Sequence, residues 1–273
     1  MLPEDKLQRS NYGSIKRIAD SEGPAVANRA PAVARTAIIL RLLASSRSGL
    51  GVIEIARRVG LVPSTCLHIL RALVDEGFVT FNPGKKTYRI GVGLLTLVRE
   101  AMANSDYPKA VQPALNDLTA EYKVTAVAVE SDHTGRMVVV ALSRSNSLVS
   151  LHINVGSRYP AYTGATGRLV AAGANLPRDE LKEKFDTISW EKEPRFEDWC
   201  EEVERARVEG VAVDRGNTMK GLTSIATLIP PGADRAVRAI VLMGFDHQMT
   251  ERSLRQLKQS LLQTAKSVVD QLN

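Results

Sequence analysis

Apolar residues recur at helical spacing in three short segments near the start of the chain. Residues 33–44 carry apolar side chains three or four positions apart, and so do residues 52–59 and 63–76. Such spacing predicts amphipathic helices. Gly60 suits the left-handed conformation that ends a helix, and Pro63 suits the first turn of the next one. The sequence therefore predicts a helix-turn-helix made by the second and third segments.

A short alternating pattern follows the third predicted helix. Residues 78–90 contain two runs of alternating side chains on either side of Asn82-Pro83-Gly84-Lys85, which is a turn signal. This pattern predicts a β-hairpin with a basic tip. Three helices followed by such a hairpin indicate a winged helix-turn-helix.

The rest of the chain alternates between predicted helices and strands. An apolar-rich helix is expected over 94–103 and a longer one over 107–122. The predicted strands cover 124–130, 137–144, 148–155, 222–229 and 236–245, and the later predicted helices cover 168–174, 196–209 and 250–272. Strands with helices on their faces predict a sensor-like α/β or α+β domain.

These elements divide the chain into four expected parts. A polar tail covers residues 1–30, the winged helix-turn-helix covers 31–92, a linker helix covers 93–105, and a ligand-binding domain covers 106–273. The expected fold class is α+β, with an N-terminal winged helix-turn-helix and a C-terminal α/β domain. The linker helix and the helix after it also offer an assembly surface, which favours at least a dimer.

Positive charge is concentrated in the N-terminal third. Residues 1–103 hold 15 Lys and Arg against 8 Asp and Glu, a net +7, whereas the whole chain carries +6. This asymmetry indicates a polyanionic partner, with a solvated basic surface as the alternative. Cys66 and Cys200 are far apart and define neither a disulfide framework nor a zinc site.

No stretch approaches the roughly 18 apolar residues of a membrane span. The first residues also lack the apolar core of a signal peptide. We therefore expect a cytoplasmic protein without a membrane partner.

The third predicted helix begins with residues suited to contacting DNA. In a helix-turn-helix, the first residues of this helix meet bases and phosphates in the major groove, and hydroxyls and free N–H groups bind phosphate. The candidate DNA-contacting residues are Arg57, Arg58, Ser64, Thr65, His68, Arg71, Lys85 and Lys86. The alternatives are that Ser64 and Thr65 only begin the helix, that His68 is a bystander, and that the hairpin lysines are merely solvated.

Polar residues in apolar surroundings indicate a small-molecule site in the second half of the chain. The run from Gly164 through Ala165 and Thr166 precedes a predicted helix, so its backbone N–H groups can face an anion such as a carboxylate. Asp214 and Ser224 are polar residues within apolar stretches, which is typical of ligand sites. The alternatives are a tight turn, a loop-capping aspartate and a serine bonded within its own sheet.

At this point the chain resembles a known family, the IclR-type bacterial transcription regulators. The resemblance rests on IEIARRVGLVPSTCLHILRAL and GFVTFNPGKKTYRIGVGLLTL, and it resumes in VGSRYPAYTGATGRLVAAG, EGVAVDRGNTMKGLTSIATLI and AIVLMGFDHQMT. It extends from about residue 31 to the C-terminus. It implies a winged helix-turn-helix joined to a GAF-like effector-binding domain, in a dimer or tetramer whose DNA binding responds to a small organic molecule.

This chain departs from the family pattern at four positions. The family usually has a basic residue where this chain has Pro63, and an arginine where it has His68, so we expect its DNA sequence preference to differ. The family's organic-acid binders often carry serines where this chain has Val241 and Met243. We therefore predict an effector less polar than a two- or three-carbon keto acid, such as an aromatic or longer aliphatic carboxylate.

The function that the resemblance implies is ligand-responsive repression or activation of a catabolic operon. No GxSxG, P-loop or HExxH motif is present, and the four histidines are scattered, so we expect no catalytic residues, cofactor or metal. The alternatives are a small-molecule enzyme and a non-catalytic interaction protein with a degenerate winged helix.

Overall fold

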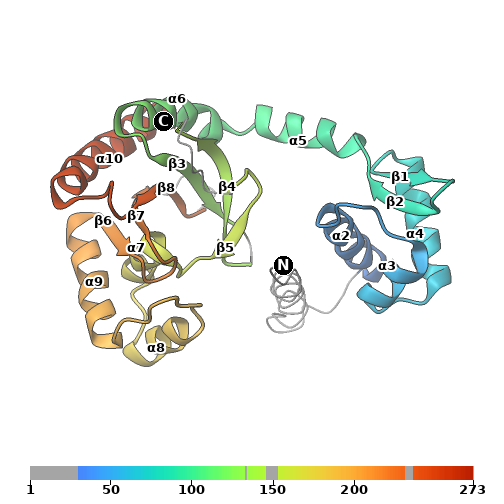
Figure 1. The fold of residues 1–273 in the computed structure, drawn as a ribbon, viewed down its shortest axis with the longest axis horizontal. Helices are drawn as coiled ribbons and strands as arrows, with labels where there is room; N and C mark the ends of the chain where they lie inside the picture. The colour runs from blue at the N-terminus through green and yellow to red at the C-terminus, as the bar shows by residue number, and fades with distance from the viewer. Residues whose placement is uncertain (1–29, 133, 146–152, 231–235, 273) are drawn as a thin grey trace, which may run out of the picture. The chain divides into compact units, whose positions relative to one another are not determined.

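The chain folds into two compact units that divide between Ala101 and Met102 (Figure 1). The computed structural model describes residues 30–132, 134–145, 153–230 and 236–272. Most of the predicted strand 148–155 lies outside the described residues, and residues 153–155 form no strand.

The first unit is a winged helix-turn-helix. Its elements are α2 (Pro31–Ala44), α3 (Val52–Val59), α4 (Pro63–Asp75), β1 (Val79–Asn82) and β2 (Thr87–Ile90). Helix α5 (Gly93–Ala103) follows the hairpin, and the boundary between the two units falls within its last turn. Gly60 has a φ of +69° and ends α3. Leu50 exchanges two backbone hydrogen bonds with Tyr88 on β2, which ties the segment before α3 to the hairpin. A single apolar core joins the three helices to the hairpin.

The second unit is built on an antiparallel sheet of six strands, in the order β5-β4-β3-β8-β7-β6. The strands are β3 (Thr125–Ser131), β4 (Arg136–Ser143), β5 (Arg158–Pro160), β6 (Val211–Arg215), β7 (Leu222–Ile229) and β8 (Arg238–Phe245). The helices are α6 (Asp106–Tyr122), α7 (Gly164–Ala174), α8 (Arg178–Asp186), α9 (Phe196–Glu209) and α10 (Glu251–Leu272).

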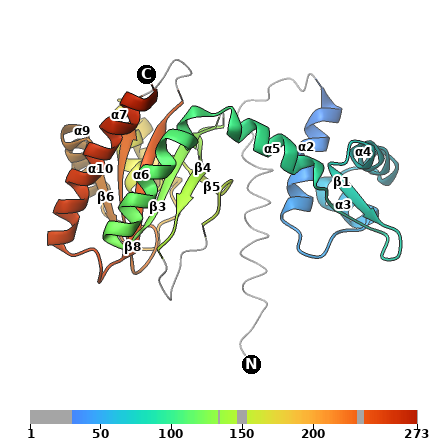
Figure 2. The same ribbon diagram turned by 90° about the horizontal axis from the view of Figure 1, so that it is seen from above.

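Helices cover both faces of this sheet (Figure 2). Helices α6 and α10 pack on one face, where Leu115 and Leu261 are fully buried in the larger core. Helix α7 packs on the other face over a second core that contains Val127 and Val241, and α9 packs beside α7. Behind α7, helices α8 and α9 enclose an aromatic cluster around Trp199.

Three features of the second unit differ from the sequence-based expectation. Helix α7 begins at Gly164 rather than at residue 168, so the glycine-rich run is the first turn of the helix. Strands β5 and β6 and helix α8 were not predicted. Strands β5 and β6 span only three and five residues, too short for a clear periodic pattern.

Candidate nucleic-acid interface and effector site

Helix α4 presents one polar face and one buried face. Cys66, Leu70 and Leu73 are buried in the core of the first unit. Ser64 and His68 are exposed, and Arg71, one turn further on, continues the same exposed face. Three of the predicted DNA-contacting side chains therefore form one stripe along the helix.

The first turn of α4 leaves backbone donors free. Val62 is the N-cap and Pro63 the first helical residue, and no side chain caps the helix. Ser64 and Thr65 thus lie inside the first turn and not at the cap. Since the first N–H groups of a helix have no partner within it, the N–H groups of these two residues are available to a phosphate.

The hairpin places two lysines at an exposed tip. Lys85 and Lys86 lie in the turn between β1 and β2, and the Lys85 N–H donates to Asn82 Oδ1 at 2.9 Å. On α3, Arg57 is exposed, whereas Arg58 is half-buried and forms an ion pair with Glu54. The eight predicted residues thus share one unit, and Arg58 has a structural role as well.

In the second unit, the strand register brings the predicted effector residues to one sheet face. Asp214 on β6 pairs with Ser224 on β7, Ser224 pairs with Met243 on β8, and Met243 pairs with Thr125 on β3. Directly paired residues point to the same face of a sheet. Val241 lies two residues from Met243 and therefore faces the same way.

The first turn of α7 lies over this row. The Ala165 N–H donates to Ser224 Oγ at 3.4 Å. Gly164 has a φ of +66°, and a side chain there would come within 3.6 Å of the hydroxyls of Ser224 and Thr218. The free N–H groups of this turn, which includes Thr166, thus lie next to the polar end of the row.

A fully buried arginine fixes this turn. Arg168 is 1% exposed, and its Nη1 donates to the Gly164 carbonyl at 3.0 Å and lies 3.2 Å from Asp214 Oδ1. Its Nε donates to Glu202 Oε2 at 2.6 Å, and its Nη2 donates to Asn217 Oδ1 at 3.2 Å. The guanidinium therefore joins α7 to β6, to α9 and to the loop after β6. The same network borders a crevice of about 370 Å³ beside β6.

Sequence reasoning missed Arg168 and two other residues near the start of α7, Thr218 and Tyr159. Thr218 donates its hydroxyl to Asp214 Oδ2 at 2.6 Å. Tyr159 packs in the core beneath α7, where burial raises its pKa to about 12. The only available signal was a single charged residue in the otherwise small and apolar run GATGRLVAAGA.

Comparisons with known proteins match both units. The family model for the bacterial transcriptional regulator IclR C-terminal domain matches residues 100–270, and the model for the IclR helix-turn-helix domain matches residues 32–83. The glycerol operon regulatory protein of Streptomyces griseus is 26% identical over 211 residues, which cover 77% of this chain and 83% of that protein.

Solved structures show the same fold. An IclR transcriptional regulator from Alicyclobacillus acidocaldarius has a TM-score of 0.77 at 22% identity, covering 90% of this chain and 100% of that one. An IclR homologue from Microbacterium hydrocarbonoxydans, crystallised with 4-hydroxybenzoate, has a TM-score of 0.70 at 16% identity, covering 88% and 98%.

The helix-turn-helix and the second domain together define a DNA-binding transcriptional regulator with an effector-binding domain. The chain belongs to the IclR family of bacterial transcriptional regulators. The family resemblance and the fold class inferred from the sequence are thus confirmed. Members of this family are transcriptional regulators that bind DNA and small-molecule effectors. No helix in the described ranges is both long and apolar enough to cross a membrane.

We predict that Arg168→Met lowers the free energy of unfolding of the second domain by about 3 kcal/mol, because it leaves the buried Asp214 carboxylate without its counter-charge. Both tryptophans, Trp190 and Trp199, belong to this domain, so their fluorescence during urea unfolding measures the loss. Adding Asp214→Asn to the variant should restore part of the stability. An unchanged urea midpoint for Arg168→Met would contradict this view of the network. Arg205→Met, an exposed position on α9, is the matched control.

Proposed function

We propose that this protein is a ligand-responsive regulator of a catabolic operon, and that its effector is an aromatic or longer aliphatic carboxylate. The observation that carries the DNA-binding part is the exposed stripe of Ser64, His68 and Arg71 on α4, next to a hairpin with two lysines at its tip. The proposed DNA contacts are the eight residues named above. Pro63 has no N–H to donate, so we expect fewer backbone contacts at the helix start.

The proposed contacts separate into two kinds. Lys85 and Lys86 would neutralise phosphates, which sets affinity and its salt dependence. His68, in the middle of the exposed stripe, would contact base edges, which sets sequence preference. Substituting the hairpin lysines should therefore change the salt dependence of DNA binding, whereas substituting His68 should change its sequence preference.

We predict that Lys85→Ala combined with Lys86→Ala weakens binding to all DNA sequences alike. The slope of log K against log salt should become shallower by about 2, since each phosphate contact contributes about 0.9. His68→Ala should instead reduce the preference for the operator over mutated operators about tenfold, with little change in slope. Fluorescence anisotropy with DNA from upstream of the protein's own gene measures both effects.

The control for this experiment is Lys184→Ala, which removes an exposed lysine from α8 in the other unit. It should leave both slope and preference unchanged. If the unmodified protein shows no salt-sensitive, sequence-dependent binding with or without ligand, the proposal fails.

The effector part of the proposal rests on the character of the sheet face below α7. The first turn of α7, from Gly164 to Thr166, offers N–H donors to a carboxylate, and Asp214 and Ser224 are the polar groups beside it. Val241 and Met243 make the neighbouring surface apolar, and they belong to the same apolar cluster as Tyr159 and Tyr162. Such a surface favours an apolar ligand body over a small keto acid. A distant relative of the same fold binds 4-hydroxybenzoate, which is a ligand of this kind.

We predict that calorimetry shows tighter binding of 4-hydroxybenzoate than of glyoxylate. Val241→Ser combined with Met243→Ser should weaken 4-hydroxybenzoate binding at least tenfold, because apolar contact area is lost, and should strengthen glyoxylate binding through the new hydroxyls. The control is Val140→Ser, because Val140 lies on β4 and packs on the other face of the sheet, toward α6 and α10. Tight binding of glyoxylate or pyruvate by the unmodified protein, without binding of any aromatic acid, would refute this assignment.

Helix α5 supports a homo-oligomer, a dimer or a tetramer. Leu95, Val98 and Met102 lie three and four residues apart and are exposed at 67%, 52% and 39%. Helix α5 has no buried residue within one copy of the chain, although apolar residues predominate in it. An exposed apolar stripe on a helix indicates a helix-helix interface.

We predict that Leu95→Glu combined with Val98→Glu lowers the assembly state, because two charges would be buried in the interface. Light scattering after size-exclusion chromatography gives the mass. Thr96→Glu adds a charge on the side of α5 away from the stripe and should leave the mass unchanged. A monomeric unmodified protein, or an unaltered mass for the double variant, would argue against this interface.

A further inference from the structure

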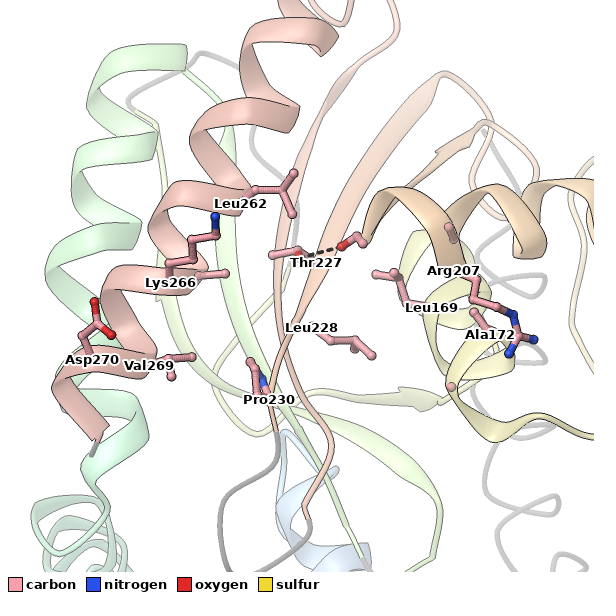
Figure 3. A pocket seen from close by; sticks show the side chains of 14 residues that line it. Leu169, Ala172, Arg207, Thr227, Leu228, Pro230, Leu262, Lys266, Val269 and Asp270 are labelled. Atoms are coloured by element: carbon pink, nitrogen blue, oxygen red, sulfur yellow. Dashed lines mark hydrogen bonds between the residues drawn. The ribbon is translucent and has the colours of Figure 1, made fainter.

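A hollow of about 480 Å³ lies at the edge of the sheet in the second unit, away from the row described above. Strand β6 starts at Val211, which pairs with Thr227, but β7 continues to Ile229. The end of β7 is therefore not covered by β6, and the hollow lies between it, α10 and the ends of α7 and α9 (Figure 3). Thr227 Oγ1 donates to the Gly210 carbonyl at 2.8 Å and closes one side.

The walls of this hollow are apolar and small. The apolar side chains come from three helices and one strand, and they include Leu169, Ala172, Ala206, Leu228, Leu262 and Val269. Gly173 on α7 also lines the hollow, and no atom lies within 4 Å of the position that a side chain there would occupy. Volumes of this size and character are typical of small-molecule sites.

The hollow is distinct from the proposed effector site. It is lined by the C-terminal half of α7, whereas the effector row lies below the first turn of that helix. Gly164, Ser224, Val241 and Met243 do not line it. A ligand here would contact α10, which lies on the opposite face of the sheet from α7.

The charges at the rim favour one kind of ligand. Lys266 on α10 is exposed, and no ion pair joins it to any residue that the structure describes. Arg207, on the opposite wall, is already bound to Glu204 at 3.2 Å. Asp270, one turn after Lys266, forms no ion pair with it, and Figure 3 shows the Lys266 amine directed toward Leu262 and away from Asp270. A single carboxylate can therefore pair with Lys266, whereas a second negative charge would approach Asp270.

We propose that this hollow is a second small-molecule site, which takes an amphipathic monocarboxylate. The aliphatic part of the ligand fills the space between α7, β7 and α10, and its carboxylate pairs with Lys266. Octanoate is a suitable probe because it has one charge and a flexible apolar body, and 1-octanol has the same body without the charge.

Calorimetry on the full-length protein tests the proposal. We expect saturable octanoate binding that is lost in Gly173→Leu, which fills the hollow at a position where the helix has room for a side chain. Lys266→Gln should weaken octanoate binding about fivefold and leave 1-octanol binding unchanged. Lys109→Gln, which changes an exposed lysine on α6, should alter neither.

Three outcomes would overturn the proposal. The first is no saturable octanoate binding to the unmodified protein. The second is binding that survives Gly173→Leu but is lost when Val241 and Met243 are both changed to serine, which would place octanoate in the effector site. The third is a lower oligomeric mass for Gly173→Leu, which would show that a second copy of the chain occupies the hollow.

Discussion

The buried guanidinium of Arg168 connects several elements of the effector-binding domain and fixes their relative positions. A charge inside a protein is strongly unfavourable unless it is paired and hydrogen-bonded. Arg168 satisfies this condition because Gly164 on its own helix and Glu202, Asp214 and Asn217 on α9, β6 and the following loop all contact it. If one of these partners moved away, a buried charge would be left without its full set of contacts, which is unfavourable. The network therefore restrains the α7 turn, β6 and α9 as one body.

Two glycines impose a second constraint on helix α7, which carries Arg168. At Gly167, a side chain would lie 1.8 Å from the carbonyl oxygen of Tyr162, so the backbone itself packs against the preceding turn. At Gly164, the positive φ turns the chain so that its carbonyl reaches Arg168. The two glycines thus serve different purposes, one for close approach and one for conformation. Together they shape the first turn of α7, whose Ala165 N–H donates to Ser224 Oγ.

Much of the first unit could be predicted from its sequence, because its signals are local. Gly60 marks the end of α3 and Pro63 marks the start of α4, and the four adjacent residues 82–85 predict the hairpin turn. The sheet order of the second unit is not local, since β3 lies between β4 and β8, which are distant in sequence. Asp214 and Ser224 could be proposed as pocket residues from their apolar surroundings. Their contact with α7 and the part played by Arg168 depend on tertiary packing, which no spacing in the sequence reveals.

Helix α7 carries both the first turn proposed to contact the effector and a long run of buried residues. Its residues from Gly164 to Leu169 are buried, as are Ala171 and Ala172, so the helix moves as a unit or not at all. The loop that holds Asn217 also accepts two backbone N–H groups, from Glu191 and Lys192, and thereby connects Arg168 to the aromatic cluster of α8 and α9. If α7 can take two positions, a ligand that binds its first turn more tightly in one of them would therefore shift the aromatic cluster as well. By reciprocity, any partner that favours one position of α8 and α9 would change effector affinity by the same factor.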